Sequence, residues 1–258
     1  MDFSEYRPYQ PGDDLRSLDW KVYGRTDRLY TKLYVPEQEE TVYFLLDTSL
    51  SMHPKWPALK TIVMGLANVV LGQGDRVGIY PLLNPDLLDK SGVSPMRGRS
   101  ALARISTFLQ GVNCAGVTDL DQAFTESSRR IKKRSHLIVV SDFLQEGAGL
   151  EGLSKLRYRR HRMSLIQLLS PSELDPKSKL SPGEWELFDP EYDQESGPSL
   201  RIDIGSGSFK LYSQALQEHI EELKLFGQRA GAIFIQTSTE FQPLSFFSED
   251  LRKAGLLT

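Results

Sequence analysis

Three oxygen-bearing side chains follow an apolar strand pattern near the start of the chain. Residues 43–46 are apolar, and Asp47, Ser49 and Ser51 come next at every second position. In an extended or tightly turning segment, alternate side chains point to the same side, so these three can converge on one point. One carboxylate and two hydroxyls suit a hard cation such as Mg²⁺, Mn²⁺ or Ca²⁺, whereas zinc prefers sulfur and imidazole nitrogen. The spacing therefore predicts a divalent-metal site at a strand end.

Two further oxygen donors occur later, each at a point where the pattern changes. Thr118 precedes a helical pattern at 120–131, and Asp142 follows a second buried strand pattern at 136–141. Each has a structural alternative: Thr118 can cap its helix, with Asp121 as a capping-box partner, and Asp142 alone is typical of a strand-end cap. Five oxygen donors in this order favour metal binding over a set of unrelated caps.

The rest of the pattern shows how these residues come together. Strand and helix patterns alternate, which implies a mostly parallel sheet with helices on both faces. The strand patterns lie at 29–35, 41–46, 76–83, 136–141, 163–169 and 232–236. Ligands of such sheets bind beyond the carboxyl ends of the strands, where the strand order reverses. If the strands at 41–46 and 136–141 are neighbours there, Asp47 and Asp142 face one cavity.

These residues resemble a known site. Together the five donors look like the metal-ion-dependent adhesion site of von Willebrand factor A domains; they are Asp47, Ser49, Ser51, Thr118 and Asp142. The segment 5–21, with Pro11-Gly12-Asp13-Asp14, is similar to the signature of a bacterial family labelled domain of unknown function 58, DUF58, which carries this A-type domain. The resemblance is dense from Phe3 to Asp142 and looser afterwards. It implies an α/β fold, a von Willebrand factor A-like (Rossmann-like) mostly parallel sheet flanked by helices.

The resemblance also implies a mechanism. Ser49, Ser51 and Thr118 would coordinate the cation, while Asp47 and Asp142 would position it, partly through waters. An Asp or Glu of another protein would complete the coordination shell, because neutral hydroxyls leave the ion electrophilic. Members of the family are associated with MoxR-type AAA+ ATPases. We therefore expect a metal-dependent protein-interaction module that acts with such an ATPase in chaperone-like complex assembly or maturation.

Enzymatic functions find less support in the sequence. It has no phosphate-binding loop of the type Gly-x-x-x-x-Gly-Lys-Ser/Thr and no Gly-x-Ser-x-Gly nucleophile turn, and Cys114 has no sequence-adjacent base. The alternative is a metal-dependent phosphohydrolase, because a metal with an open position can activate water. That chemistry also needs a general base and a phosphate clamp, and the sequence shows no clear pair. We therefore predict that the protein is not an enzyme.

The chain divides into an arm and a domain. We expect an N-terminal arm with an edge strand at 1–35 and the A-like domain at 36–258, with an insertion at about 171–206 that forms a β-hairpin. The arm has Asp13 and Asp14 before a helical pattern at 15–22, which they can cap. Its aromatic residues are too numerous for a disordered tail. We expect Leu18 and Trp20 to be buried and at least one Arg to pair with an Asp of the arm.

Composition fits these assignments. Forty per cent of the 258 residues are hydrophobic, which is ample for a core, and the net charge of −3 argues against a broad nucleic-acid-binding surface. The basic runs at 129–134 and 157–162 are typical of helix C-termini. No apolar run reaches membrane-spanning length. A single cysteine excludes an intramolecular disulfide, and the N-terminus lacks a secretory signal pattern, so we expect a cytoplasmic protein.

Overall fold

A six-stranded sheet organises residues 40–258, the larger of the two units into which the chain divides after Glu39. The computed structural model describes residues 2–35, 39–82, 92–178, 183–188 and 199–256. The strand order is β10-β7-β6-β3-β4-β5, and all neighbouring pairs are parallel except β4 and β5. The strands are β3 (Thr41–Asp47), β4 (Arg76–Leu82), β5 (Val93–Met96), β6 (His136–Ser141), β7 (Arg162–Leu169) and β10 (Ile233–Ser238).

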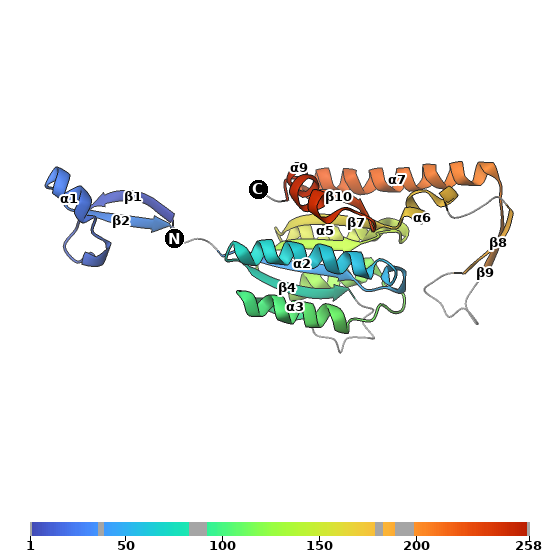
Figure 1. Ribbon diagram of the computed structural model, residues 1–258, viewed down its shortest axis with the longest axis horizontal. Helices are drawn as coiled ribbons and strands as arrows, with labels where there is room; N and C mark the ends of the chain where they lie inside the picture. The colour runs from blue at the N-terminus through green and yellow to red at the C-terminus, as the bar shows by residue number, and fades with distance from the viewer. Residues whose placement is uncertain (1, 36–38, 83–91, 179–182, 189–198, 257–258) are drawn as a thin grey trace. The chain divides into compact units, whose positions relative to one another are not determined.

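Helices cover both faces of this sheet, which confirms the predicted α/β fold (Figure 1). One face packs against α2 (Trp56–Gly72), α3 (Arg99–Gly111) and a closing helical segment made of α8 (Pro243–Ser245), a π turn (Phe246–Asp250) and α9 (Leu251–Lys253). The other face packs against α4 (Leu120–Arg130), α5 (Leu150–Tyr158) and α7 (Ser206–Ala230). None of the helices in the described part of the chain combines the length and the apolar character that crossing a bilayer requires.

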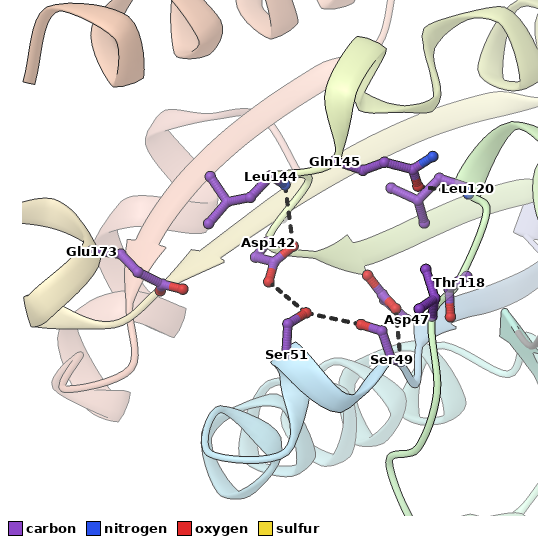
Figure 2. Close-up of a pocket in the computed structure, with 10 residues that line it drawn as sticks. Asp47, Ser49, Ser51, Thr118, Leu120, Asp142, Leu144, Gln145 and Glu173 are labelled. Carbon is purple, nitrogen blue, oxygen red and sulfur yellow. Dashed lines mark hydrogen bonds between the residues drawn. The ribbon is translucent and has the colours of Figure 1, made fainter. Parts of the chain in front are cut away.

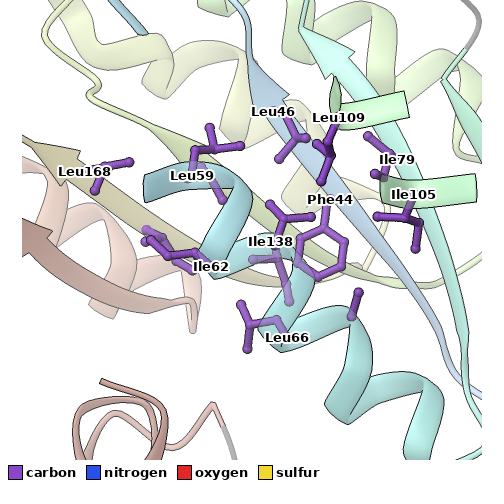
Figure 3. Close-up of a cluster of buried hydrophobic side chains, with 14 of the residues drawn as sticks. Phe44, Leu46, Leu59, Ile62, Leu66, Ile79, Ile105, Leu109, Ile138 and Leu168 are labelled. Carbon is purple, nitrogen blue, oxygen red and sulfur yellow. The ribbon is translucent and has the colours of Figure 1, made fainter. Parts of the chain in front are cut away.

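The central strand β3 contributes to both halves of the core. Phe44 and Leu46 are fully buried in the cluster under α2 and α3, whereas Leu45 is fully buried in the opposite cluster (Figure 3). Figure 3 shows the Phe44 ring beside Ile138 of β6 and Leu66 of α2. A parallel strand covered on both faces reads as a continuous apolar run, which is the pattern found at 42–46. This core fixes the strand from which the candidate site begins.

The predicted neighbours at the centre of the sheet are confirmed. β3 pairs in parallel with β6, with Val42 opposite His136 and Leu46 opposite Val140. The chain runs from β3 outward to β4 and β5 and then returns to β6 on the other side of β3, so the strand order reverses between β3 and β6. Both strands end at the same edge, and a ligand site is expected there in open α/β sheets.

The insertion contains the predicted hairpin and, before it, two short helices. β8 (Gly183–Phe188) pairs antiparallel with β9 (Ser199–Ile204). The segment between β7 and β8 forms α6 (Pro171–Leu174) and a 3₁₀ turn (Pro176–Ser178), which the sequence did not predict. At the opposite edge of the six-stranded sheet, β5 pairs antiparallel with β4. Residues 83–91 lie outside the described residues.

The predicted cap of α4 is wrong by one residue. Asp119, not Thr118, caps the helix, because the Asp119 carboxylate accepts a hydrogen bond from the Gln122 N–H (2.9 Å). Asp121 accepts from the Gly152 N–H (2.6 Å) and so joins α4 to α5 instead of closing a capping box. The two helices approach closely at this point, since a Cβ on Gly152 would lie 2.6 Å from the Asp121 carbonyl oxygen. Thr118 is therefore not needed for capping.

The smaller unit contains a strand that the sequence did not predict. β1 (Asp2–Pro8) pairs antiparallel with β2 (Tyr30–Val35). Between them lie a 3₁₀ turn (Leu15–Ser17) and α1 (Trp20–Thr26). The helix expected at 15–22 is thus split: Asp14 caps the 3₁₀ turn, as predicted, and Asp19 caps α1. Charged and apolar residues are mixed in β1, so its pattern does not show a buried face.

Side chains of the arm match the predictions only in part. Leu18 is buried, and Arg7 pairs with Asp13 at 2.6 Å, as predicted. Trp20 is 61% exposed, so the prediction of its burial is wrong. Trp20 is the first residue of α1, and its ring contacts the Tyr23 ring edge-on, with the ring centroids 6.3 Å apart.

Candidate functional site

A cleft of about 280 Å³ opens at the carboxyl edge of β3 and β6 (Figure 2). Its walls contain all five oxygen donors singled out in the sequence. The lining residues are Asp47, Ser49, Ser51, Val117, Thr118, Leu120, Asp142, Leu144, Gln145 and Glu173. Residues 95 positions apart in the chain thus share one small space, as the strand order requires.

Asp47, the last residue of β3, is held by hydrogen bonds to both of its carboxylate oxygens. One oxygen accepts from the Ser49 N–H (3.0 Å) and the other from the Ser141 hydroxyl (2.6 Å). The side chain is almost fully buried. Ser141 is the last residue of β6, so this contact ties the ends of the two central strands together. Ser141 was not among the residues predicted from the sequence.

Two serines connect Asp47 with Asp142. Ser49 lies two residues after the end of β3, and Ser51 lies in a 3₁₀ turn at Leu50–Met52. Their hydroxyl oxygens are 3.0 Å apart, and the Ser51 hydroxyl donates to Asp142 Oδ2 at 3.0 Å (Figure 2). The alternation of side chains predicted from the Asp-x-Ser-x-Ser spacing therefore brings the serine oxygens to one side of the turn.

Asp142 is positioned by an unusual backbone conformation at the next residue. Phe143 has φ of 54°, a left-handed value that a bulky residue rarely adopts. Its ring is fully buried in the core, and its N–H donates to the Ser141 hydroxyl (2.9 Å). Gln167 from β7 donates its side-chain amide to the Asp142 carbonyl (3.0 Å). These contacts hold a strained turn, as is common at ligand sites.

Thr118 reaches the cleft because its loop is fastened to the loop after β3. The Ala115 N–H donates to the Thr48 carbonyl, and the Leu50 N–H donates to the Gly116 carbonyl, both at 3.0 Å. Thr118 itself is buried, at 6% exposure. Its position in the cleft wall beside Asp47 comes from this loop pairing, not from the cap of α4.

Lys55 and Glu173 are part of the site and were missed by sequence reasoning. Lys55 Nζ lies 2.6 Å from Asp142 Oδ2 and 2.6 Å from Glu173 Oε1. Glu173 also closes a capping box with Ser170 at the start of α6. The pattern Ser-Pro-Ser-Glu directly after a strand is a signal for that capping box. Lys55 gives no comparable signal, because it looks like any lysine at the start of a helix.

The electrostatics of the cleft favour a cation. Burial, and then the charge of Asp142, raise the pKa of Asp47, and hydrogen bonds from Ser141 and Ser49 oppose this shift. Three carboxylates and the Lys55 ammonium leave a formal charge of −2. Within the described residues, no group of three or more His, Cys, Asp or Glu side chains is placed to hold a metal. Serine and threonine hydroxyls would therefore supply most ligands of any ion in this cleft.

Cys114 lies four residues before Thr118 and is buried. Burial raises the pKa of its thiol to about 12, and the charge of Asp47 adds to the shift. The thiol is therefore protonated at neutral pH. Because the thiolate is the reactive form of cysteine, Cys114 is not in the state that a nucleophile or a metal ligand requires.

Comparison with known families and proteins gives consistent matches. The chain matches the family described as "Protein of unknown function DUF58" over residues 5–221. It is 27% identical over 182 residues to an uncharacterized protein of Mycobacterium tuberculosis, a match that covers 66% of this chain and 56% of that protein. It is 30% identical over 73 residues to the uncharacterized protein YeaD of Bacillus subtilis, covering 28% of this chain and 18% of YeaD. The chain thus spans about half the length of the mycobacterial relative.

Two solved structures show a distant likeness. A von Willebrand factor type A protein from Catenulispora acidiphila aligns with a TM-score of 0.43 and 12% identity, covering 88% of this chain and 43% of that one. The pilus adhesin SpaC from Lactobacillus rhamnosus GG, in an open conformation, aligns with a TM-score of 0.43 and 12% identity. That alignment covers 52% of this chain and 24% of the adhesin.

Proposed function

The chain belongs to the DUF58 family, and on that premise we propose that it is a protein-interaction module whose partner is held through a divalent cation in the cleft. One observation carries the proposal: two carboxylates and three hydroxyls, from three segments of the chain, converge at the carboxyl edge of β3 and β6. A set of unrelated caps and turns would not bring these donors into one space.

Distances in the cleft support a small, octahedral ion. With metal–oxygen bonds of about 2.0–2.1 Å, neighbouring ligands of Mg²⁺ lie roughly 2.9 Å apart, whereas the longer bonds of Ca²⁺ separate them by about 3.3 Å or more. The Ser49 and Ser51 hydroxyl oxygens are 3.0 Å apart. This is also the length of the hydrogen bond that joins the two hydroxyls, so Mg²⁺ or Mn²⁺ would need the smaller adjustment of this pair, and we propose one of them as the ion. Ser49, Ser51 and Thr118 would coordinate the ion, Asp47 would hold it, and Asp142 would stand in the outer shell.

The neutral ligands of the proposed site favour an acidic partner. A divalent ion neutralises the formal charge of −2 in the cleft, and three neutral hydroxyls leave the ion itself electrophilic. When bound, the ion supplies a centre that a carboxylate can complete. We propose that an Asp or Glu of the partner protein takes this position, and that the partner is a MoxR-type AAA+ ATPase in chaperone-like complex assembly or maturation in the cytoplasm.

Calorimetric titration with Mg²⁺ and Mn²⁺ tests the metal site. Asp47→Ala should weaken binding by about a hundredfold or more, because it removes the buried charge nearest the serine ligands. Asp250→Ala is a matched control, since Asp250 is an exposed acid in the closing segment and makes no side-chain cap. Equal metal affinity in wild type and Asp47→Ala would remove the basis of the proposal.

Adjacent residues allow a sharp test of partner binding. Thr118→Ala should weaken a complex with a purified MoxR-type ATPase, and excess chelator should weaken it in the wild type. Asp119→Ala is the control: it removes the α4 cap, at a cost of about 1 kcal/mol, but leaves the proposed ligands in place. A complex that persists undiminished in chelator would argue against a metal-bridged interface.

A further inference from the structure

A buried ammonium group lies beside the candidate ligands and has no role in the function proposed so far. Lys55 is 2% exposed, and its Nζ bridges Asp142 and Glu173 at 2.6 Å each. Burying an ion pair carries a large desolvation cost, and apolar residues of similar volume often replace such pairs without loss of stability. The presence of this triad therefore calls for a reason other than stability.

The position of Lys55 in α2 makes the charge more unfavourable. Lys55 is the N-cap residue of this 17-residue helix and makes no side-chain capping hydrogen bond. Cations are disfavoured at the N-terminus of a helix, where the macrodipole is positive, and lysine is not among the residues that cap well. Neither helix formation nor packing explains a lysine here. The positive charge of Lys55 is therefore the property that needs a functional explanation.

That charge acts on Asp142. Asp142 Oδ2 accepts from both the Ser51 hydroxyl (3.0 Å) and Lys55 (2.6 Å), while Oδ1 accepts from the Leu144 N–H (3.1 Å). Each oxygen of this carboxylate thus has a partner in the chain. Asp142 Oδ2 already contacts the Ser51 hydroxyl, and moving it further, toward an ion held by the serines, would lengthen its contact with Lys55.

Glu173 keeps Lys55 from following such a movement. One Glu173 oxygen contacts Lys55, and the other accepts from the Ser170 N–H (2.6 Å) and the Ser170 hydroxyl (2.8 Å). The capping box therefore fixes Glu173, and Glu173 fixes the far side of the ammonium group. Lys55 lies between two anchored carboxylates.

We propose that Lys55 is a positioning residue that keeps Asp142 out of the inner coordination shell of the cation and so leaves one position open for a carboxylate of the partner. The inference rests on the metal site proposed above. Without Lys55, Asp142 is free to bind the ion directly and the cleft becomes more negative by one charge. The ion is then bound more tightly, and an incoming carboxylate is repelled.

Mn²⁺ is the probe, because its inner-shell waters can be counted by water-proton relaxation. Lys55→Met should bind Mn²⁺ on the order of tenfold more tightly and retain one fewer inner-shell water than the wild type. If Lys55 only supports the fold, Lys55→Met should instead bind Mn²⁺ more weakly, because structural damage to the site weakens metal binding. Lys60→Met is the control: it makes the same change on the same helix, in a separate groove beside Met64 and Ser106.

The double variant Lys55→Met/Glu173→Gln removes one positive and one negative charge, so it tests the idea without leaving excess buried charge. We expect the same loss of one water from its bound Mn²⁺. An unchanged water count and affinity in the folded single or double variant would overturn the role of Lys55 and leave the metal site standing. Failure of the wild type to bind Mn²⁺ would overturn the metal site itself.

Discussion

Asp19 in the arm and Asp47 in the cleft are both buried aspartates, yet their pKa values shift in opposite directions. Asp19 accepts hydrogen bonds from the Tyr6 hydroxyl (2.8 Å) and two backbone N–H groups and pairs with Lys32 (3.1 Å). The Tyr6 hydrogen bond, followed by that from Lys32, holds the pKa of Asp19 well below its usual range. Burial and the nearby charge of Asp142 raise the pKa of Asp47.

This difference distinguishes a structural carboxylate from one suited to ligand binding. The donors around Asp19 come from the arm itself, so its charge is already stabilised and holds β1, β2 and α1 together. Asp47 faces a second carboxylate across two serine hydroxyls, and a cation would relieve the repulsion. The same contrast between the two units appears in their tryptophans: Trp56 of the domain is 7% exposed, whereas Trp20 of the arm is 61% exposed.

The largest effect on stability is expected at Trp56. Its ring is part of the core cluster under α2 and α3, and its Nε1–H donates to the Leu109 carbonyl (3.1 Å). Trp56→Ala should lower the free energy of unfolding by about 3–5 kcal/mol, because it leaves both a cavity and an unpaired carbonyl. Urea unfolding followed by circular dichroism measures the change. A loss below about 1 kcal/mol would show that the core closes around the missing ring.

The effect of Mg²⁺ on stability should distinguish Asp47 from Asp19. At a hundred times its dissociation constant, Mg²⁺ should raise the free energy of unfolding of the domain by about 2.7 kcal/mol. Asp47→Asn should reduce this increment to about 0.4 kcal/mol or less, while Asp19→Asn should retain it in full, because Asp19 belongs to the other unit. Thermal melts with Mg²⁺ and with chelator test both variants. Loss of the increment in Asp19→Asn would break the distinction between the two carboxylates.

A pH effect is expected from a third buried group, His136. Burial, and then the charge of Arg162, lower its pKa from 6.5 to about 4, and its Nε2 hydrogen-bonds the Ser164 hydroxyl (2.8 Å). Between these two pH values the unfolded chain binds a proton that the folded domain does not. Stability is therefore full above pH 6.5 and falls toward pH 4, by roughly 1.4 kcal/mol per pH unit.

His136→Gln isolates this contribution. Glutamine can keep a hydrogen bond to Ser164 but does not titrate, so the slope of unfolding free energy against pH should decrease by the equivalent of one proton. His161 provides a background slope in both proteins, because burial lowers its pKa as well. Urea unfolding at pH 4.5, 5.5 and 6.5 gives the slopes. Identical slopes in wild type and variant would show that His136 is protonated in the folded domain.

Local sequence signals predicted the parts of the fold and site that depend on short-range patterns. The apolar run before Asp47 and the alternation of Ser49 and Ser51 located the strand end, and the buried run before Asp142 located the second one. Parallel pairing of these strands then follows from the β/α order. Their common cleft is a consequence of topology, and the central strands β3 and β6 show the continuous apolar pattern that is typical of parallel strands covered on both faces.

The residues whose roles were not predicted from the sequence are positioned by tertiary contacts. Lys55 meets Asp142 and Glu173 only because β6 and β7 end beside the start of α2, and nothing in its own neighbourhood shows this. Asp119 competes with Thr118 for the cap, and adjacent residues that both cap well cannot be ranked from sequence. Trp20 looked like a core residue because tryptophan usually is, but it begins a short helix whose cap, Asp19, faces the sheet of the arm.

The smallest effect is expected at Trp20. Its contact with Tyr23 is an i,i+3 pair on the surface of α1, and such pairs contribute about 0.2–0.5 kcal/mol. Trp20→Ala should therefore leave the rate of proteolysis between residues 8 and 29 nearly unchanged. Leu18→Ala is the control in the same unit, since Leu18 is buried and its truncation should accelerate cleavage clearly. If Trp20→Ala accelerates cleavage as much as Leu18→Ala, the indole is covered in solution, and the contrast between the exposed tryptophan of the arm and the buried one of the domain does not hold.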